Sequence, residues 1–139
     1  MKKRTIYITN YDMKRLEELI ESCLYRDANR EKQKMLNLLL GRLSRSETVL
    51  WKEINPNVVT MNSTVRLKKL DDNEKSEYSL VFPEDANLRR NKITILSYLG
   101  ISLLGRKVND VIKVRDQEGT QRAVINSILY QPEANGRCH

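Results

Sequence analysis

The stretch that decides the fold is NPNVVTMNSTVRL, residues 55–67, because the hydrophobic period changes within it. Pro56 stands between two asparagines, a combination that disfavours helix. Beyond Pro56, residues that suit a buried face occupy every second position: Val59, Met61, Ser63, Val65 and Leu67. This alternation predicts a half-buried strand. We therefore place a boundary at residues 55–56, with helices before it and strands after it.

Upstream of the boundary, apolar residues recur with the helical period. The two stripes are Leu16, Leu19, Ile20 and Cys23, then Leu36, Leu39, Leu40 and Leu43, with Leu50 later on the second. Thr9 or Asn10 offers an N-cap, and Asp12 lies in the first turn, where a carboxylate favours the helix dipole. Gly41 either allows a close helix crossing or is a tolerated weak point. Two stripes joined by a polar link near 25–29 predict an antiparallel helical hairpin, after a strand-like start at residues 5–8.

Downstream of the boundary, short strand patterns alternate with turn residues. A strand returns over residues 78–82 after a turn at 71–74, and a polar loop spans 83–92. A short strand at 93–95 precedes a short helix that Ser97 could cap and that Gly105 ends. Two last strands are expected near 111–115 and 122–130.

These patterns predict an α+β fold, in which a helical hairpin precedes a mostly antiparallel sheet domain with one short helix. We expect the hairpin over residues 1–55, the sheet domain over 56–134 and a polar tail over 135–139. At 139 residues the chain has room for one such domain with a helical appendage. Its core should be mostly aliphatic, because aromatic residues make up only 6% of the chain.

The net charge of +7 is spread along the chain. Residues 1–56 hold 12 Lys and Arg against 8 Asp and Glu, and residues 57–139 hold 13 against 10. A nucleic-acid-binding protein more often shows a basic stripe or patch. The sequence therefore favours a mildly basic solvated surface, and a weak nucleic-acid contact stays as the alternative.

Several classes of chemistry lack the residues that they need. Cys23 and Cys138 lie far apart with no second pair, so neither a disulfide framework nor a zinc site is implied. His139, at the end of the chain, supplies no general base, and the five glycines form no phosphate loop. No stretch approaches the ~20 apolar residues of a membrane span. We expect a cytoplasmic protein that is not an enzyme and holds no metal or cofactor.

Four blocks of sequence resemble one known family, in the family's own order. They are VVTMNSTV (58–65), YSLVFPEDA (78–86), SYLGISLLG (97–105) and ILYQPEA (128–134). The chain resembles the GreA/GreB transcription elongation factor family, and within it the short-armed Rnk branch, the regulators of nucleoside diphosphate kinase. Tyr98 departs from the family's usual proline. Asn109 replaces a usual glycine, although asparagine also tolerates a left-handed turn.

The resemblance implies an FKBP-like C-terminal domain beside a coiled-coil arm that docks near the secondary channel of bacterial RNA polymerase. It assigns polymerase contact to Ser97, Tyr98, Leu99 and Gly100. Leu99 could instead be a core residue of the short helix, which makes Ser97 and Tyr98 the better contact candidates. We expect a monomeric transcription regulator that competes with Gre-type cleavage factors.

In the resembled cleavage factors, acidic residues at the arm tip help to bind magnesium. The corresponding tip here offers Asp27 and Glu31, but Arg26, Arg30, Lys32 and Lys34 surround them. These cations would repel Mg²⁺ and pair with the acids. The first helix, of about 14 residues, would reach only about 21 Å, far less than the arms of the cleavage factors.

The chemistry of the tip therefore favours a non-catalytic regulator. Two alternatives remain, a short-armed cleavage factor that uses Asp27 and a protein-interaction module that acts through the hairpin. The fold also raises prolyl isomerase activity, but the aromatic-poor sheet domain argues against it.

Overall fold

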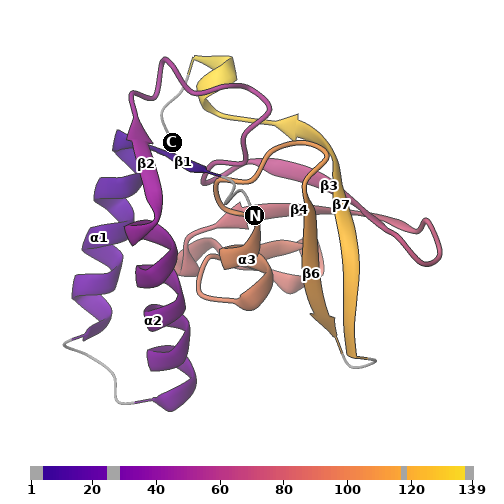
Figure 1. Ribbon diagram of the computed structural model, residues 1–139. Helices are drawn as coiled ribbons and strands as arrows, with labels where there is room; N and C mark the ends of the chain where they lie inside the picture. Colours follow the sequence, from indigo (N-terminus) through magenta and orange to yellow (C-terminus); the bar gives the residue numbers. More distant parts are fainter. Residues whose placement is uncertain (1–4, 25–28, 117–118, 137–139) are drawn as a thin grey trace.

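The computed structural model describes residues 5–24, 29–116 and 119–136. A helical hairpin lies beside a curled sheet, and a small two-stranded sheet closes the base of the hairpin (Figure 1). The predicted α+β class, a helical hairpin followed by an antiparallel-rich sheet with one short helix, is confirmed. Within the described residues, no helix is long and apolar enough to cross a membrane.

The hairpin consists of α1 (Asn10–Leu24) and α2 (Arg30–Ser44), which we call the arm. The backbone N–H of Asp12 donates to Thr9 Oγ1 (3.0 Å), so Thr9 caps α1. Asn29 caps α2 in the same way through Glu31 N. Most of the predicted stripes are buried: Leu16, Ile20 and Cys23 on α1, and Leu36, Leu39 and Leu43 on α2. Leu40 was wrongly placed on the stripe, since it is 42% exposed, and Met35 is buried in addition.

The second helix is shorter than the sequence predicts. It ends at Ser44, and strand β2 (Ser46–Val49) pairs in parallel with β1 (Ile6–Thr9). The Ser46 hydroxyl donates to Leu43 O (2.7 Å), which satisfies one carbonyl at the helix end. Leu50 lies beyond β2 and is 57% exposed, so its place on the helical stripe was wrong. The helix ends well before Pro56, because strand pairing takes over the chain.

The main sheet has the strand order β5-β4-β3-β7-β6. Its strands are β3 (Thr64–Lys69), β4 (Lys75–Val81), β5 (Lys92–Thr94), β6 (Val111–Asp116) and β7 (Gly119–Tyr130). All neighbours are antiparallel except β4 and β5, which are parallel. The 3-10 turns η1 (Pro83–Asp85) and η2 (Leu88–Arg90) occupy the predicted polar loop, and η3 (Glu133–Asn135) follows β7.

Residues 59–63 are a buried turn and not the first half of a strand. Thr60 N donates to Ser63 Oγ (2.9 Å) and Ser63 N donates to Thr60 O (3.1 Å). Asn62 adopts a left-handed φ of 66° between them. The strand therefore begins only at Thr64. The predicted alternation of buried residues holds from there on, whereas Thr60 is buried although the pattern placed it outside.

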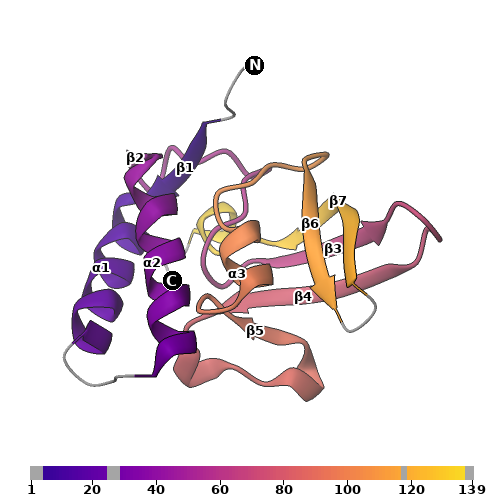
Figure 2. The same cartoon turned by 60° about the horizontal axis from the view of Figure 1, so that its bottom comes forward.

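Helix α3 (Tyr98–Leu103) fills the inside of the curled sheet (Figure 2). It contacts β6 at one edge and β4 and β5 near the other, so the sheet wraps around it. Gly105 follows at φ +79°, and a Cβ there would collide with Ile6 of β1. Asn109 has φ 77°, which confirms the predicted left-handed turn. The core is aliphatic as expected, and Phe82 is its one phenylalanine.

Candidate functional site

The SYLG segment, residues 97–100, lies at the start of α3. The hydroxyl group of Ser97 makes hydrogen bonds within the fold. Gly100 N donates to Ser97 Oγ (3.1 Å), and Ser97 Oγ donates to Thr94 O (2.7 Å). Ser97 is therefore the N-cap of α3, as the sequence suggested. Both of these bonds are internal, so replacing Ser97 would loosen the helix as well as any contact that it makes.

Gly100 and Leu99 also have structural roles. Gly100 is buried, and a Cβ on it would lie 2.2 Å from Thr94 O, so only glycine lets α3 approach β5 this closely. Leu99 packs against the core as a partly buried side chain. Tyr98 is half-exposed, and Lys34 Nζ of α2 lies 5.8 Å from the centre of its ring. Of the four predicted contact residues, Ser97 and Tyr98 border a groove, and Tyr98 is the one without a structural role in α3.

Tyr98 borders a groove of about 490 Å³ between the arm and the sheet domain. One wall is the first part of α2, with Lys32 and Met35, and the other comes from two separate segments of the sheet domain. Pro83 and Ala86 belong to one family-like block and Tyr98 to another, and the groove brings the two blocks together. The full lining is Asn29, Glu31, Lys32, Met35, Pro83, Ala86, Thr94, Leu96, Ser97 and Tyr98.

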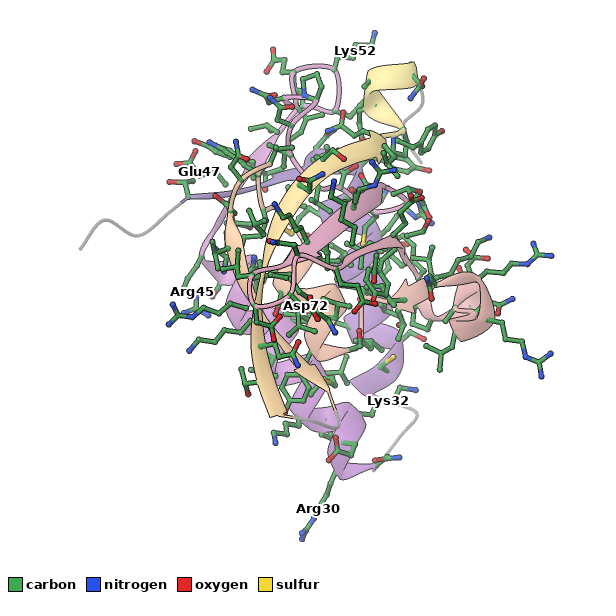
Figure 3. The ribbon with its side chains drawn as sticks, turned by 90° about the vertical axis from the view of Figure 1, so that its right-hand side faces the viewer. Arg30, Lys32, Arg45, Glu47, Lys52 and Asp72 are labelled. Atoms are coloured by element: carbon green, nitrogen blue, oxygen red, sulfur yellow. The ribbon has the colours of Figure 1, made fainter. Side chains whose placement is uncertain are left out.

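Only part of the arm tip belongs to the described residues. Arg30 is exposed and extends away from the body of the molecule (Figure 3). Glu31 lies in the first turn of α2 and borders the groove, as does Lys32. The predicted tip residues Arg26 and Asp27 fall outside the described residues. Across residues 5–24, 29–116 and 119–136, no group of three or more His, Cys, Asp or Glu could hold a metal ion.

A buried carboxyl joins α1 to the sheet domain. Asp12 is 1% exposed, and its Oδ2 accepts from Met61 N (3.0 Å) in the 59–63 turn. On the other side of this turn, Thr60 Oγ1 donates to Glu133 Oε1 (2.7 Å). Burial is the largest cause that raises the pKa of Asp12, to about 7, and the neighbouring Glu133 raises it further. Burial also raises the pKa of Glu133.

A buried cation makes the matching contact from α2. Arg42 donates from Nε and Nη2 to Leu104 O (3.2 and 3.0 Å) and from Nη2 to Ser102 O (3.2 Å). These carbonyls lie at the end of α3, so they have no partner within the helix. Burial, followed by repulsion from Arg106 and Arg45, lowers the pKa of Arg42 to about 10.

Neither of these two contacts is predicted by a local pattern of residues. The local pattern predicts only that Asp12 favours the helix dipole, and it makes no prediction for Arg42. Asp12 bonds 49 residues along the chain, and Arg42 bonds to residues about 60 positions away. The contacts hold the arm at a fixed angle to the sheet domain, and so they also fix the walls of the groove.

Known proteins resemble this chain along nearly its whole length. Residues 54–130 match the family described as "Transcription elongation factor, GreA/GreB, C-term", and residues 4–37 match "Rnk N-terminus". The transcription elongation factor GreA of Thermosipho africanus is 30% identical over 111 residues, which cover 78% of this chain and 70% of that protein. The regulator of nucleoside diphosphate kinase of Escherichia coli K12 is 29% identical over 137 residues, 98% of this chain and 97% of that protein.

A solved structure agrees with these sequence matches. The prokaryotic transcription elongation factor GreA/GreB from Nitrosomonas europaea superposes with a TM-score of 0.77 at 35% identity. The superposition covers 91% of this chain and 100% of the other. The likeness therefore includes the arm as well as the sheet domain.

Proposed function

This chain belongs to the GreA/GreB family of transcription elongation factors, and from that premise we propose that it is a non-catalytic regulator that binds bacterial RNA polymerase. We place the docking surface at the groove beside Tyr98, near the polymerase secondary channel, where the chain competes with Gre-type cleavage factors. The chain acts as a monomer in this proposal.

The observation that carries the proposal is the meeting of two family-like blocks at one groove. Pro83 and Ala86 come from the first block and Tyr98 from the second, and both line the same space. Pro83 and Ala86 are exposed and Tyr98 is half-buried, so packing in the core does not account for all of these side chains. A concave surface with an aromatic side chain at its rim is a common form of docking site, because aromatic anchors contribute much of the binding energy at interfaces.

The arm supports a regulator without cleavage activity. Helices α1 and α2 have 15 residues each, which gives a reach of about 22 Å. Glu31 is the acid of the described tip, and Arg30 and Lys32 flank it in sequence. Cations next to a carboxylate make it a poorer ligand for Mg²⁺, because they repel a second cation.

Replacing Tyr98 by alanine tests the docking surface. We expect Tyr98→Ala to weaken polymerase binding on the order of tenfold or more, as for an aromatic anchor at an interface. Tyr11→Ala is the matched control, because Tyr11 is 37% exposed on α1 and does not line the groove. Binding is measured by fluorescence anisotropy of labelled protein titrated with core polymerase. Equal affinities for the two variants would contradict the docking assignment.

Ser97 should not be used for this test. Because its hydroxyl caps α3, Ser97→Ala is expected to cost about 1 kcal/mol of folding stability. A loss of binding in that variant would mix two causes.

A stalled elongation complex tests the absence of cleavage. We expect no shortened transcript when the protein is added at saturating concentration, and slower cleavage by an added Gre factor because the two compete. If 3′ fragments are released by the wild-type chain and vanish with Asp27→Ala, the chain is a short-armed cleavage factor and our proposal is wrong.

A further inference from the structure

The outer face of the main sheet carries a band of cationic side chains that lie far apart in the sequence. On this face, β3 presents Arg66 and Lys68, β4 presents Lys75, β7 presents Arg122 and β6 presents Lys113, as the strand register requires. Their inward-pointing neighbours, such as Val65, Leu67, Ile112 and Ala123, are buried in the core. Arg66 is paired with Glu77 on β4 (2.9 Å). The other four are the cation band: Lys68, Lys75, Arg122 and Lys113.

Two pairs within the band place like charges directly opposite each other. Lys68 faces Lys75 across β3 and β4, and Lys113 faces Arg122 across β6 and β7. Directly opposed like charges destabilise a sheet. Among the described residues, none of these four side chains has a hydrogen bond or an ion pair that would offset the repulsion. The folded chain therefore holds a repulsive arrangement that a bound anion would relieve.

The band also has a shape that suits an extended polyanion. Neighbouring strands lie about 4.8 Å apart, so the four strands from β4 to β6 span about 14 Å. The helices of the described chain lie away from this face: α3 fills the inside of the curl, and the arm lies beyond it (Figures 1 and 2). Val111 and Val124 adjoin the cations on the same face, and Val111 is 47% exposed.

Apart from Glu77, which pairs with Arg66, the described acids near the band lie at one end. Asp71, Asp72 and Glu74 belong to the turn that follows Lys68 and precedes Lys75, at the tip of the β3–β4 hairpin. Figure 3 labels Asp72 there, and its Oδ1 already accepts from Glu74 N (2.9 Å). Arg122 also lies beside this turn, because Leu70 N donates to Arg122 O (3.1 Å) and Asp71 borders the same hollow as Arg122. Lys113, on the edge strand β6, lies one strand farther from these acids.

We propose that the outer face of the sheet binds the phosphate backbone of single-stranded nucleic acid along the cation band. A flexible single strand can follow a convex surface, and phosphates supply the repeated negative charge that the band lacks. A duplex is stiff and would touch a convex sheet at one point only. This contact needs no polymerase, and so it is independent of the docking groove beside Tyr98.

The test uses the full chain without polymerase. A fluorescein-labelled oligothymidylate of about 20 nucleotides is titrated with the protein between about 20 and 200 mM NaCl, and the slope of log K against log salt is measured. Four phosphate contacts predict a slope of about −3, since each contributes about −0.7 on single strands. The double variant Lys68→Gln/Lys75→Gln should make this slope shallower by about 1.4.

Two further variants make the result specific. The charge-keeping Lys68→Arg/Lys75→Arg should retain the wild-type slope. The matched control Lys14→Gln/Arg30→Gln removes two exposed cations from the arm and should also leave the slope unchanged. The proposal is overturned if the control flattens the slope as much as Lys68→Gln/Lys75→Gln does, because the arm would then be the anion site.

A competition experiment separates nucleic acid from an acidic protein partner. Unlabelled oligothymidylate should displace the labelled strand at a concentration of charge at least tenfold lower than that of polyglutamate. Equal competition by polyglutamate would assign the band to an acidic protein surface and would refute the proposal. A wild-type slope near zero would also refute it.

Discussion

The buried carboxyl of Asp12 makes the stability of this chain depend on pH in an unusual direction. Its pKa is about 7 in the folded chain, against an ordinary value of 3.8. The folded state therefore binds a proton that the unfolded state has released over the range between these values. Stability from this group is fully present below pH 3.8 and is lost as the pH rises through about 7. Ordinary surface-paired carboxylates act in the opposite direction.

The size of the effect follows from the two pKa values. Each tenfold change in proton affinity is worth about 1.4 kcal/mol, so the whole range corresponds to about 4 kcal/mol. About 3 kcal/mol of this falls between pH 5 and pH 8. Asp12→Asn keeps an oxygen for Met61 N and has no charge at any pH. We expect the free energy of unfolding of the wild type, minus that of Asp12→Asn, to fall by about 3 kcal/mol from pH 5 to pH 8.

The assay is urea unfolding followed by far-ultraviolet circular dichroism at the two pH values. Glu18→Gln is the control, because Glu18 is an exposed acid on the same helix and its replacement should leave the pH dependence unchanged within tenths of a kcal/mol. If the wild type and Asp12→Asn lose stability in parallel from pH 5 to pH 8, then Asp12 does not titrate in this range and the account of its burial is refuted.

Two other predictions concern the contacts that hold the arm and α3. Arg42→Ala should lower the free energy of unfolding in urea by about 2–4 kcal/mol, because Leu104 O and Ser102 O lose their donor. The control Arg45→Ala removes a side chain that points outward (Figure 3) and should cost under about 1 kcal/mol. Equal costs for the two variants would show that the buried hydrogen bonds of Arg42 add no stability. Gly41→Ala should raise stability by about 0.5–1 kcal/mol because only the Arg45 side chain lies within 4 Å of the added Cβ, and Gly100→Ala should lower it by at least about 2 kcal/mol because of the clash with Thr94 O. A thermal melt of each variant checks the opposite signs, and a stabilised Gly100→Ala would contradict the close approach of α3 to β5.

Local patterns in the sequence predicted the elements whose contacts are local. The helical stripes, the Ser97 cap and the Asn109 turn each depend on residues a few positions apart, and each is present in the structure. The four ordered blocks also identified the family, as the comparisons confirm. The structure also decides between the two interpretations of Gly41. No neighbouring helix approaches it closely, so it is a tolerated weak point in α2 and not a site of close helix crossing.

The sequence failed where distant contacts override a local pattern. Strand β2 forms because it pairs with β1, which lies some 40 residues earlier in the chain. No residue pattern near Ser46 predicts this pairing. The alternation over residues 59–63 predicted a strand, but hydrogen bonds between Thr60 and Ser63 close a turn. The cation band was missed for a related reason. A count by segment cannot detect four charges that β-pairing gathers from residues 68–122.

The parallel pairing of β1 and β2 has a consequence for how arms of different length can arise in this family. The pair fixes where α1 begins and where α2 ends, because Ile6 is in register with Ser46 and Thr9 with Val49. The distal turns of the helices are not part of this clamp. Seven residues added to each helix at the tip would complete about two turns, restore the facing stripes and extend the reach by about 10 Å. The length of the arm can thus change at its tip without any change to the sheet domain that carries it.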